Sequence, residues 1–299
     1  MKKELRQGYI ALILVSFFWG TTYIASKIGT HHMPGIFVSG VRQFVSGSVM
    51  VGFFLLRGYK LPSFAELRKI SVQGIFLLCI ANGLLTWSLE YISSGLAAII
   101  AGLVPLFIAL FSLWLSRSAR LTAWMVWGLV IGFVGICVIF YDYIGQLGDR
   151  SFLGGIVLAL LSVLSWSFGT VYTAKHKLTV DILFNVGLQM LIAGLVLLPV
   201  CFLTGKYVNL ASADHQALWA LSYLVVFGSF LGYTAYVVAI NKLPATQVSV
   251  YAYINPIVAV AFGWLLLQEK LNAHMILGTI ITIGGVYLVN KEFKKQIKQ

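Results

Sequence analysis

The sequence has few charged residues and few cysteines. Charged side chains make up 10% of its 299 residues, whereas soluble domains contain about 25%. Hydrophobic residues make up 60%, and the mean hydropathy is +0.92. The three cysteines all lie in apolar runs, so they predict no disulfide framework. This composition excludes an ordinary soluble domain and predicts an integral membrane protein.

Residues typical of catalytic and metal sites are also sparse within the apolar runs. All five histidines fall in loops or at the ends of these runs, and Glu90 is the one carboxylate well inside them. The pattern G-x-x-x-x-G-K-[ST], which would bind a nucleotide phosphate, does not occur. Paired carboxylates, a Ser-His pair and a metal cluster are therefore not expected. We predict no catalytic residue, no metal and no cofactor.

Apolar runs of about 20 residues, enough to cross a hydrocarbon core of about 30 Å, recur along the whole chain. The ten predicted spans are residues 8–27, 35–56, 71–91, 94–116, 122–141, 152–174, 181–203, 217–240, 245–267 and 273–290. Most of the 21 Lys and Arg residues fall on the side that would hold both termini. The positive-inside rule therefore predicts cytoplasmic termini, and it explains the net charge of +12 without nucleic-acid binding.

The two halves of the chain share landmarks. Pro105 lies near the middle of the fourth predicted span, and Pro256 lies near the middle of the ninth, 151 residues later. Two glycines of the fifth span recur in the tenth at an offset of 150. These matches predict two five-span repeats, over residues 8–141 and 152–290. An odd number of spans inverts the second repeat, as in many secondary transporters, and makes the two prolines candidate hinges.

The two prolines have different neighbours. Pro256 has no N–H, so the carbonyl of Ala252 would lack its helical partner. Asn255 directly precedes this proline, whereas Val104 precedes Pro105. We therefore expect the ninth span to supply a polar substrate contact that the fourth span does not.

Arg42 lies about 10 Å inside the second predicted span, and Glu90 lies near the end of the third. Ionisable groups inside the membrane cost about 2.5–3.5 kcal/mol, so each needs a reason. Arg42 is either an anchor that extends toward the interface or a contact for an anionic group of the substrate, with Glu90 as its partner in the empty state. Glu90 is otherwise a solvated carboxylate at the membrane interface.

Further polar and aromatic residues share single faces of the predicted helices. The third span aligns Asn82, Thr86 and Glu90 at four-residue spacing. Each alone is also explained as a helix-to-helix hydrogen bond, but together they predict a polar interior. The candidate substrate-binding residues are Trp19, Thr22, Tyr23, Arg42, Asn82, Thr86, Trp87, Glu90, Trp166, Gln189, Tyr251 and Asn255.

Four ordered stretches of the chain carry a family resemblance. They are FFWGTTYIASK (17–27), VRQFVSG (41–47), LEYISSGLAAIIAGLVPLFIAL (89–110) and AYVVAINKLPATQVSVYAYINPIVAVAFGWLLLQEKL (235–271). Together they resemble EamA-type permeases of the drug/metabolite transporter superfamily, over essentially the whole chain. The resemblance implies ten helices in two inverted repeats around a central cavity. It also implies alternating-access transport, often export, of amino acids, metabolites or drugs.

The resemblance extends to individual residues. Arg42 matches the arginine of the family's second helix, and the two candidate hinge prolines match its paired prolines. Glu269 matches the glutamate that follows the ninth helix. The family often has a matching glutamate after the fourth helix, but this chain has Ser118 and Ala119 around that place. A mechanism that needs both acids is therefore not expected here.

We predict an all-α integral membrane protein with ten transmembrane helices in two inverted five-helix repeats. It would export small organic metabolites, such as amino acids or drugs, across the cell inner membrane by alternating access. Its expected partners are the lipid bilayer and a small-molecule substrate, and not nucleic acid. A proton, a counter-substrate and a second copy of the chain stay open as partners. The alternatives are a membrane-embedded transferase or protease and a non-transporting membrane receptor.

Overall fold

The chain is all-helical over the residues that the computed structural model describes, which are 2–115, 122–141, 144–146, 148–176, 178–243, 248, 251–270 and 272–297. The longer α-helices are α1 (Lys2–His32), α2 (Gly35–Leu56), α7 (Ala123–Tyr141), α8 (Arg150–Lys175), α9 (Ile182–Leu203), α13 (Tyr251–Leu267) and α14 (Ala273–Ile297). The shorter ones are α3 (Phe64–Gly74), α4 (Gly83–Ser88), α5 (Ser94–Ala101), α6 (Val104–Leu115), α10 (His215–Tyr223) and α11 (Thr234–Lys242). The other helical segments are η1 (Ile75–Asn82), η2 (Ile144–Gln146), η3 (Leu210–Ser212) and η4 (Leu224–Tyr233).

Six helical stretches are long and apolar enough to cross a membrane. They are Glu4–His32, Gly35–Leu56, Phe64–Ser88, Arg150–Lys175, Ile182–Leu203 and His215–Lys242. Shorter apolar helices cover Ser94–Ile108, Ala123–Ile139, Ile254–Leu267 and Ala273–Val289. Each predicted span overlaps one of these stretches, so the chain is a multi-pass membrane protein. The total of ten spans and the side on which the termini lie stay predictions.

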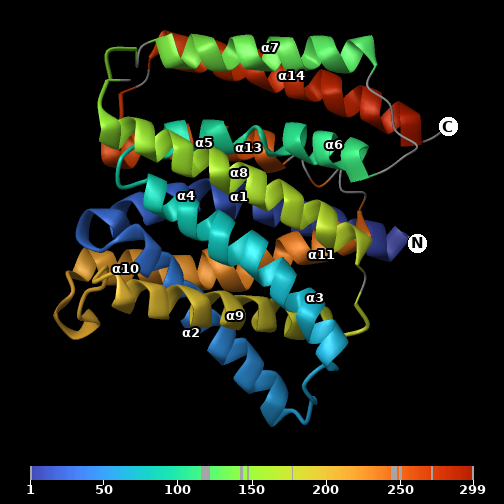
Figure 1. Cartoon of the computed structure of the whole chain (residues 1–299), viewed down its shortest axis with the longest axis vertical. Helices are drawn as coiled ribbons and strands as arrows, with labels where there is room; N and C mark the ends of the chain where they lie inside the picture. Colours follow the sequence, from blue (N-terminus) through green and yellow to red (C-terminus); the bar gives the residue numbers. More distant parts are fainter. Residues whose placement is uncertain are drawn as a thin grey trace.

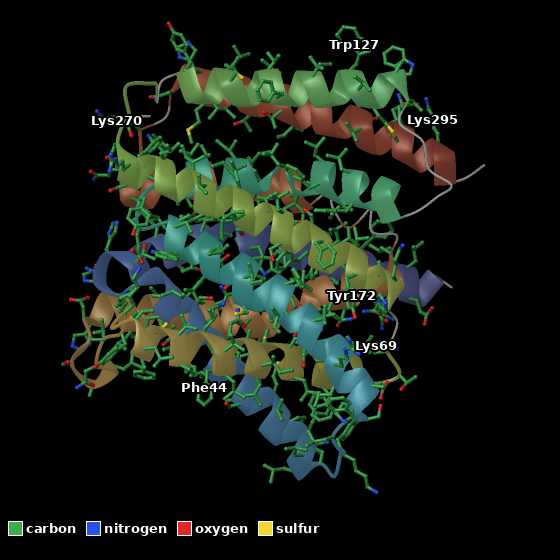
Figure 2. The ribbon with its side chains drawn as sticks, viewed as in Figure 1. Phe44, Lys69, Trp127, Tyr172, Lys270 and Lys295 are labelled. Atoms are coloured by element: carbon green, nitrogen blue, oxygen red, sulfur yellow. The ribbon has the colours of Figure 1, made fainter. Side chains whose placement is uncertain are left out.

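The helices form a layered bundle with α1 running through its middle. Figure 1 shows α7 and α14 side by side as one outer layer, and α2 and α9 near the opposite edge. Helix α1 contacts α13 and α11. Both ends of the chain lie at one end of the bundle, which we call the terminal end, and we call the other the distal end (Figure 1). Lys69 and Lys295 lie at the terminal end and Lys270 at the distal end (Figure 2).

The layer of α7 and α14 depends on glycines at the crossing of the two helices. A Cβ atom at Gly285 would lie 2.6 Å from the carbonyl oxygen of Gly128, and one at Gly278 would lie 2.5 Å from that of Gly135. These glycines therefore let the two backbones touch. Trp127 projects from α7 away from the bundle and is 60% exposed (Figure 2). The outer face of this layer is thus apolar, as lipid contact requires.

Two π-helical segments occur at corresponding places in the two halves of the chain. The segments η1 and η4 begin 149 residues apart and end 151 residues apart. Side chains of α8 bond to carbonyl groups of η1: Ser162 Oγ donates to Ala81 O and Ser165 Oγ to Phe76 O, each at 2.7 Å. π-helical turns are rare in proteins, and those that occur are often found at functional sites. The matching pair therefore makes η1 and η4 candidate parts of a functional site.

The fourth predicted span is broken beside Pro105. Helix α5 ends at Ala101, Gly102 and Leu103 form a turn, and α6 begins at Val104. Pro105 therefore lies in the first turn of α6, where its missing N–H has no helical partner to lose. The span is two helices that meet at this turn.

Pro256 differs, because α13 continues through it without interruption. Its missing N–H removes the helical partner of the Ala252 carbonyl, which bends a helix without necessarily breaking it. A Cβ atom at Gly102 would lie 3.6 Å from Ala252 O and 3.7 Å from Pro256 Cγ. The two prolines thus differ in their local backbone, although the broken span and the second proline lie against each other. A hinge role for either proline stays a prediction.

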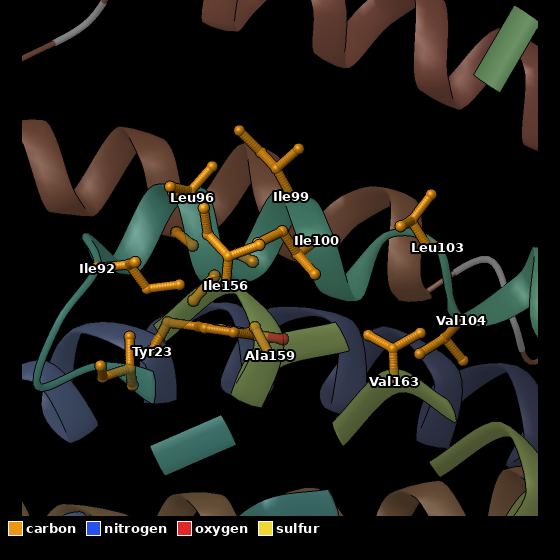
Figure 3. Close-up of a cluster of buried hydrophobic side chains, with 14 of the residues drawn as sticks. Tyr23, Ile92, Leu96, Ile99, Ile100, Leu103, Val104, Ile156, Ala159 and Val163 are labelled. Carbon is orange, nitrogen blue, oxygen red and sulfur yellow. The ribbon is translucent and has the colours of Figure 1, made fainter. Parts of the chain in front are cut away.

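Helix α5 is held by a buried cluster of apolar side chains. Leu96 and Ile100 of α5 belong to one cluster with Ile156 and Ala159 of α8 and with Tyr23 of α1 (Figure 3). All five are less than 9% exposed. Within a membrane, van der Waals contact between such closely packed side chains stabilises the association of the helices. The cluster therefore fixes α1, α5 and α8 as walls around the bundle interior.

Candidate functional site

A cavity lies inside the bundle, between α1, α2, η1, α4, α5, α6, α8, η4 and α13. The volume open to the centres of water-sized molecules is about 80 Å³. One water needs about 10–15 Å³ of such volume, so the cavity has room for roughly five to eight waters. It is therefore of a size for a small solute.

Nine of the twelve predicted binding residues line this cavity. They are Trp19, Thr22, Tyr23, Arg42, Asn82, Thr86, Trp166, Tyr251 and Asn255. The other three, Trp87, Glu90 and Gln189, lie outside the cavity wall. The helical faces read from the sequence therefore meet at one place, which makes the cavity the candidate substrate site.

Arg42 is the one charged side chain in the described wall of the cavity. It is only 5% exposed, and its Nε donates to Ser229 Oγ of η4 at 2.8 Å. The partner in this hydrogen bond is a neutral hydroxyl, and Glu90 forms no ion pair with Arg42 in the described structure. The guanidinium is therefore a buried cation without a carboxylate partner, although a buried charge usually has one.

Glu90 is engaged elsewhere. Its Oε1 accepts a hydrogen bond from the backbone N–H of Gly35, at the start of α2, at 2.5 Å. The expected pairing of Glu90 with Arg42 in the empty state is thus not present. The carboxylate instead ties the α4–α5 turn to the α1–α2 turn at the distal end, which is the role of a structural anchor.

Trp87 and Gln189 also have partners away from the cavity. Lys206 Nζ lies over the Trp87 ring, 3.9 Å from its centroid, as a cation–π pair. Gln189 donates to Gln73 Oε1 at 2.9 Å and accepts from Tyr233 OH at 2.5 Å. For Gln189 the geometry matches the helix-to-helix hydrogen bond that we gave as its alternative role.

Asn82 and Asn255 join helices as well as lining the cavity. Asn82 Oδ1 accepts from Ser39 Oγ at 3.0 Å and from Gln43 Nε2 at 3.3 Å. With the amide of Asn255 oriented to satisfy its neighbours, its nitrogen donates to Ser16 O at 2.9 Å and to Tyr251 O at 3.1 Å. Asn255 therefore links α13 to α1 directly beside the cavity.

Aromatic rings pack against one another in the wall of the cavity. The Trp19 ring lies 5.2 Å from Trp166, 5.1 Å from Tyr236 and 5.2 Å from Tyr251, measured between centroids. Tyr233 and Tyr236 are almost completely buried. Edge-to-face and tilted aromatic contacts of this kind add about 0.5–1.5 kcal/mol per pair beyond area burial. The cluster therefore forms a packed aromatic part of the cavity wall.

At the distal end, polar contacts hold the turn between α4 and α5. Lys27 Nζ donates to Leu89 O at 2.6 Å and to Ile92 O at 3.0 Å. Glu269, which follows α13, accepts from Ser94 N at 2.9 Å, from Ser94 Oγ at 2.8 Å and from Gly95 N at 3.2 Å. The carboxylate thus caps the first turn of α5, where a negative charge is favourable.

Gln268 turns Glu269 into this position. Its φ of +53° lies in the left-handed region and ends the helical geometry of α13, and the N–H of Glu269 then bonds to Gly263 O at 3.1 Å. Ser118 and Ala119, which replace the family's matching glutamate, lie outside the described residues. The capping geometry is therefore described here for Glu269 alone.

Some residues of the site have no signal in the sequence. Tyr233 lines the cavity, and Ser229 holds Arg42, but both lie in an apolar run with other aromatic and small residues. Ala98 and Ala101 of α5 also line the cavity. Small and aromatic residues are common in any membrane helix, so only the packing identifies these four.

The described part of the chain contains no group of three or more His, Cys, Asp or Glu side chains that could hold a metal. No acidic side chain lies among the described residues of the cavity wall. The site offers one cation, several hydroxyl and amide groups and aromatic rings. This set suits recognition of a small organic solute.

Comparison with known proteins identifies the family. The model of the EamA-like transporter family matches the chain twice, over residues 6–141 and 153–291. An uncharacterized inner membrane transporter of Escherichia coli (strain K12), YedA, is 33% identical over 288 residues, which cover 96% of this chain and 92% of that protein. An uncharacterized transporter of Bacillus subtilis (strain 168), YvbV, is 29% identical over 98% of this chain and 95% of its own length.

A solved structure supports the fold. One crystal structure matches 99% of each chain with a TM-score of 0.69, at 18% sequence identity. At this identity the likeness shows the fold alone. The two matches of the family model cover most of the chain and show that it belongs to the EamA-like transporter family.

Proposed function

We propose that the protein is a secondary transporter that exports small organic metabolites, such as amino acids or drugs, across the cell inner membrane by alternating access. The observation that carries this proposal is the central cavity, whose wall comes from both segments that match the family model and holds an arginine without a carboxylate partner among the described residues. The similar inner membrane transporter of Escherichia coli supports the location.

The arrangement of the cavity supports alternating access. Aromatic side chains pack in its wall, whereas hydrogen bonds and the Lys206–Trp87 pair hold the turns at the distal end. In the proposed cycle the two ends open in turn around the same site, and the broken span beside Pro105 and helix α13 at Pro256 absorb the motion. The proposed membrane arrangement keeps ten spans in two inverted repeats, residues 8–141 and 152–290, with cytoplasmic termini.

The proposed roles of the site residues follow from their positions. Arg42 contacts an anionic group of the solute, because a guanidinium binds carboxylate oxygens strongly in a desolvated place. Asn255 supplies a polar contact from α13. Trp19, Trp166 and Tyr251 form the aromatic wall. The remaining lining residues among the predicted set, Thr22, Tyr23, Asn82 and Thr86, complete the site.

We infer that transport does not depend on a proton carried by Glu90. That carboxylate is bound to the Gly35 N–H and lies outside the cavity wall. A facilitator or an exchanger with a counter-substrate therefore suits the geometry better. Glu90→Gln is expected to leave the pH dependence of flux unchanged, and a lost pH dependence would refute this inference.

The test of the proposed function is solute flux in proteoliposomes. Purified protein is expected to move at least one solute from a panel of amino acids, nucleosides and common drugs, and Arg42→Gln is expected to reduce that flux strongly. Asn255→Val is expected to raise KM, and normal kinetics would refute its substrate contact. Absence of flux for the whole panel, with turnover of a lipid-linked donor instead, would favour a membrane-embedded transferase. Ligand binding without flux or turnover would favour a receptor.

A further inference from the structure

The guanidinium of Arg42 rests on the backbone of η4. A Cβ atom at Gly228 would lie 2.6 Å from Arg42 Nη2 and 3.0 Å from Cζ, so only glycine leaves room for the group in this position. The neighbouring residue, Ser229, is fully buried and accepts the hydrogen bond from Nε. Two consecutive residues of η4 therefore form a seat for the guanidinium, which we call the Arg42 seat.

A second glycine of η4 seats Trp19 in the same way. A Cβ atom at Gly232 would lie 2.6 Å from Trp19 Nε1, and this indole N–H donates to Gly228 O at 3.2 Å. The indole and the guanidinium thus lie on one flattened side of the same helical segment. Trp19 reaches the seat from α1 and Arg42 reaches it from α2, so η4 fixes the two side chains relative to each other.

The seat leaves part of the guanidinium free. Arginine has five N–H donors in a fixed plane, and Ser229 takes the one on Nε. None of the described residues accepts a hydrogen bond from Nη1 or Nη2. Since Arg42 is 95% buried and lines the cavity, bulk water reaches these groups only through the cavity. The edge formed by the two Nη atoms is therefore an unpartnered donor pair.

We propose that Ser229 and Gly228 are positioning residues that present this edge of Arg42 to the carboxylate of an organic acid. The inference deepens the proposed function by naming the substrate class, and it rests on the cavity being the solute site. Two N–H groups in one plane match the two oxygens of a carboxylate. The aromatic wall and the absence of an acidic side chain among the described lining residues favour an anion with an apolar body over a cation.

The test uses benzoate as the probe, with benzamide as its neutral counterpart of the same shape. Isothermal titration of the purified full chain in detergent is expected to show benzoate binding at least about tenfold more tightly than benzamide, as for a hydrogen-bonded charge. Equal binding of the two probes, or binding of neither, overturns the inference.

Variants separate positioning from general packing. Ser229→Ala is expected to weaken benzoate binding about tenfold, because the guanidinium loses its fixed orientation. Gly228→Ala is expected to do the same, since the new Cβ displaces the flexible end of Arg42 and not the backbone. Ser229→Thr keeps the hydroxyl and is expected to restore binding. Ser46→Ala is the matched control, because Ser46 is also a fully buried serine but has no hydrogen-bond partner among the described residues.

Thermal unfolding of each variant shows which ones are folded. If Ser229→Ala does not fold, the benzoate affinity of Gly228→Ala is used to test the inference. Benzoate affinity that is unchanged in the folded variants of the seat overturns the inference, and so does an equal loss in Ser46→Ala. Flux is measured separately. A protein that binds benzoate as expected but moves no solute supports the Arg42 seat and refutes the proposed transport.

Discussion

Replacing Glu269 by glutamine is expected to loosen the start of α5. The carboxylate accepts three hydrogen bonds there, from the N–H and hydroxyl of Ser94 and from the N–H of Gly95. It lies 175 residues along the chain from Ser94. It therefore holds the α4–α5 turn to the end of α13 across the distal end of the bundle.

The size of the effect follows from these contacts. A glutamine can keep the bonds to Oε1, but its amide nitrogen would face the N–H of Gly95, so that backbone donor loses its acceptor. An unsatisfied donor in a partly buried place costs about 1–3 kcal/mol. The lost charge at the helix N-terminus adds about 0.3–1 kcal/mol. We expect a local loss of about 2 kcal/mol, which is roughly a 30-fold change in an opening equilibrium.

Hydrogen–deuterium exchange measures this opening directly. The amides of Ser94 and Gly95 are expected to exchange roughly 30-fold faster in Glu269→Gln than in the wild type. Gly263→Ala is expected to act in the same direction, because its Cβ would lie 2.7 Å from Glu269 Oε2. Asp149→Asn is the matched control, since Asp149 caps only its own helix through Ser151 N.

One outcome would refute the reasoning on Glu269. If both Glu269→Gln and Gly263→Ala are folded and leave the exchange of Ser94 and Gly95 unchanged, the carboxylate does not hold the start of α5. An equal increase in the Asp149→Asn variant would show a general loosening instead of a local one.

Four further substitutions test other parts of the structure. Gly285→Ala is expected to lower the thermal unfolding temperature, because its Cβ would meet the backbone of α7. In the control Gly284→Ala the Cβ meets nothing within 4 Å, so this variant is expected to raise stability by about 0.5–1 kcal/mol. Equal effects of the two substitutions would contradict the packing of α7 against α14. Gln189→Leu is expected to cost about 1–3 kcal/mol in unfolding, because Tyr233 OH loses its acceptor, and it should not change solute affinity directly. Asn255→Val is expected to cost about 1–3 kcal/mol by removing the link to α1, and an unchanged unfolding temperature would contradict that link.

Hydropathy predicted the class of this protein well because the bilayer imposes a length and an apolar composition on every span. The six long apolar stretches, from Glu4–His32 to His215–Lys242, overlap predicted spans. Many polar residues that would be costly in lipid, among them Asn82 and Arg42, do lie on the central cavity. A polar face on a membrane helix is costly in lipid, so it points to the bundle interior or a water-filled cavity. This direction could therefore be predicted without a structure.

The same reasoning could not select partners within the polar interior. Glu90 and Arg42 look like a pair in the sequence, but the Gly35 N–H takes the carboxylate and Ser229 takes the guanidinium. Gln189 joins a network of helix-to-helix hydrogen bonds. The choice of hydrogen-bond partner depends on how each helix is rotated about its axis and how deep it lies, to within a fraction of a turn. The spacing of residues along one helix specifies neither the rotation nor the depth.

The sequence by itself determined that this chain spans a membrane with apolar helices, that its halves share landmarks, and that a buried arginine needs an explanation. These features follow from local composition and from the cost of polar groups in lipid. Only the tertiary structure decided that η1 and η4 are π-helical, that the fourth span breaks while α13 continues through Pro256, and that glycines of η4 seat Arg42 and Trp19. These depend on contacts between residues far apart in the chain, whose distances no local pattern contains.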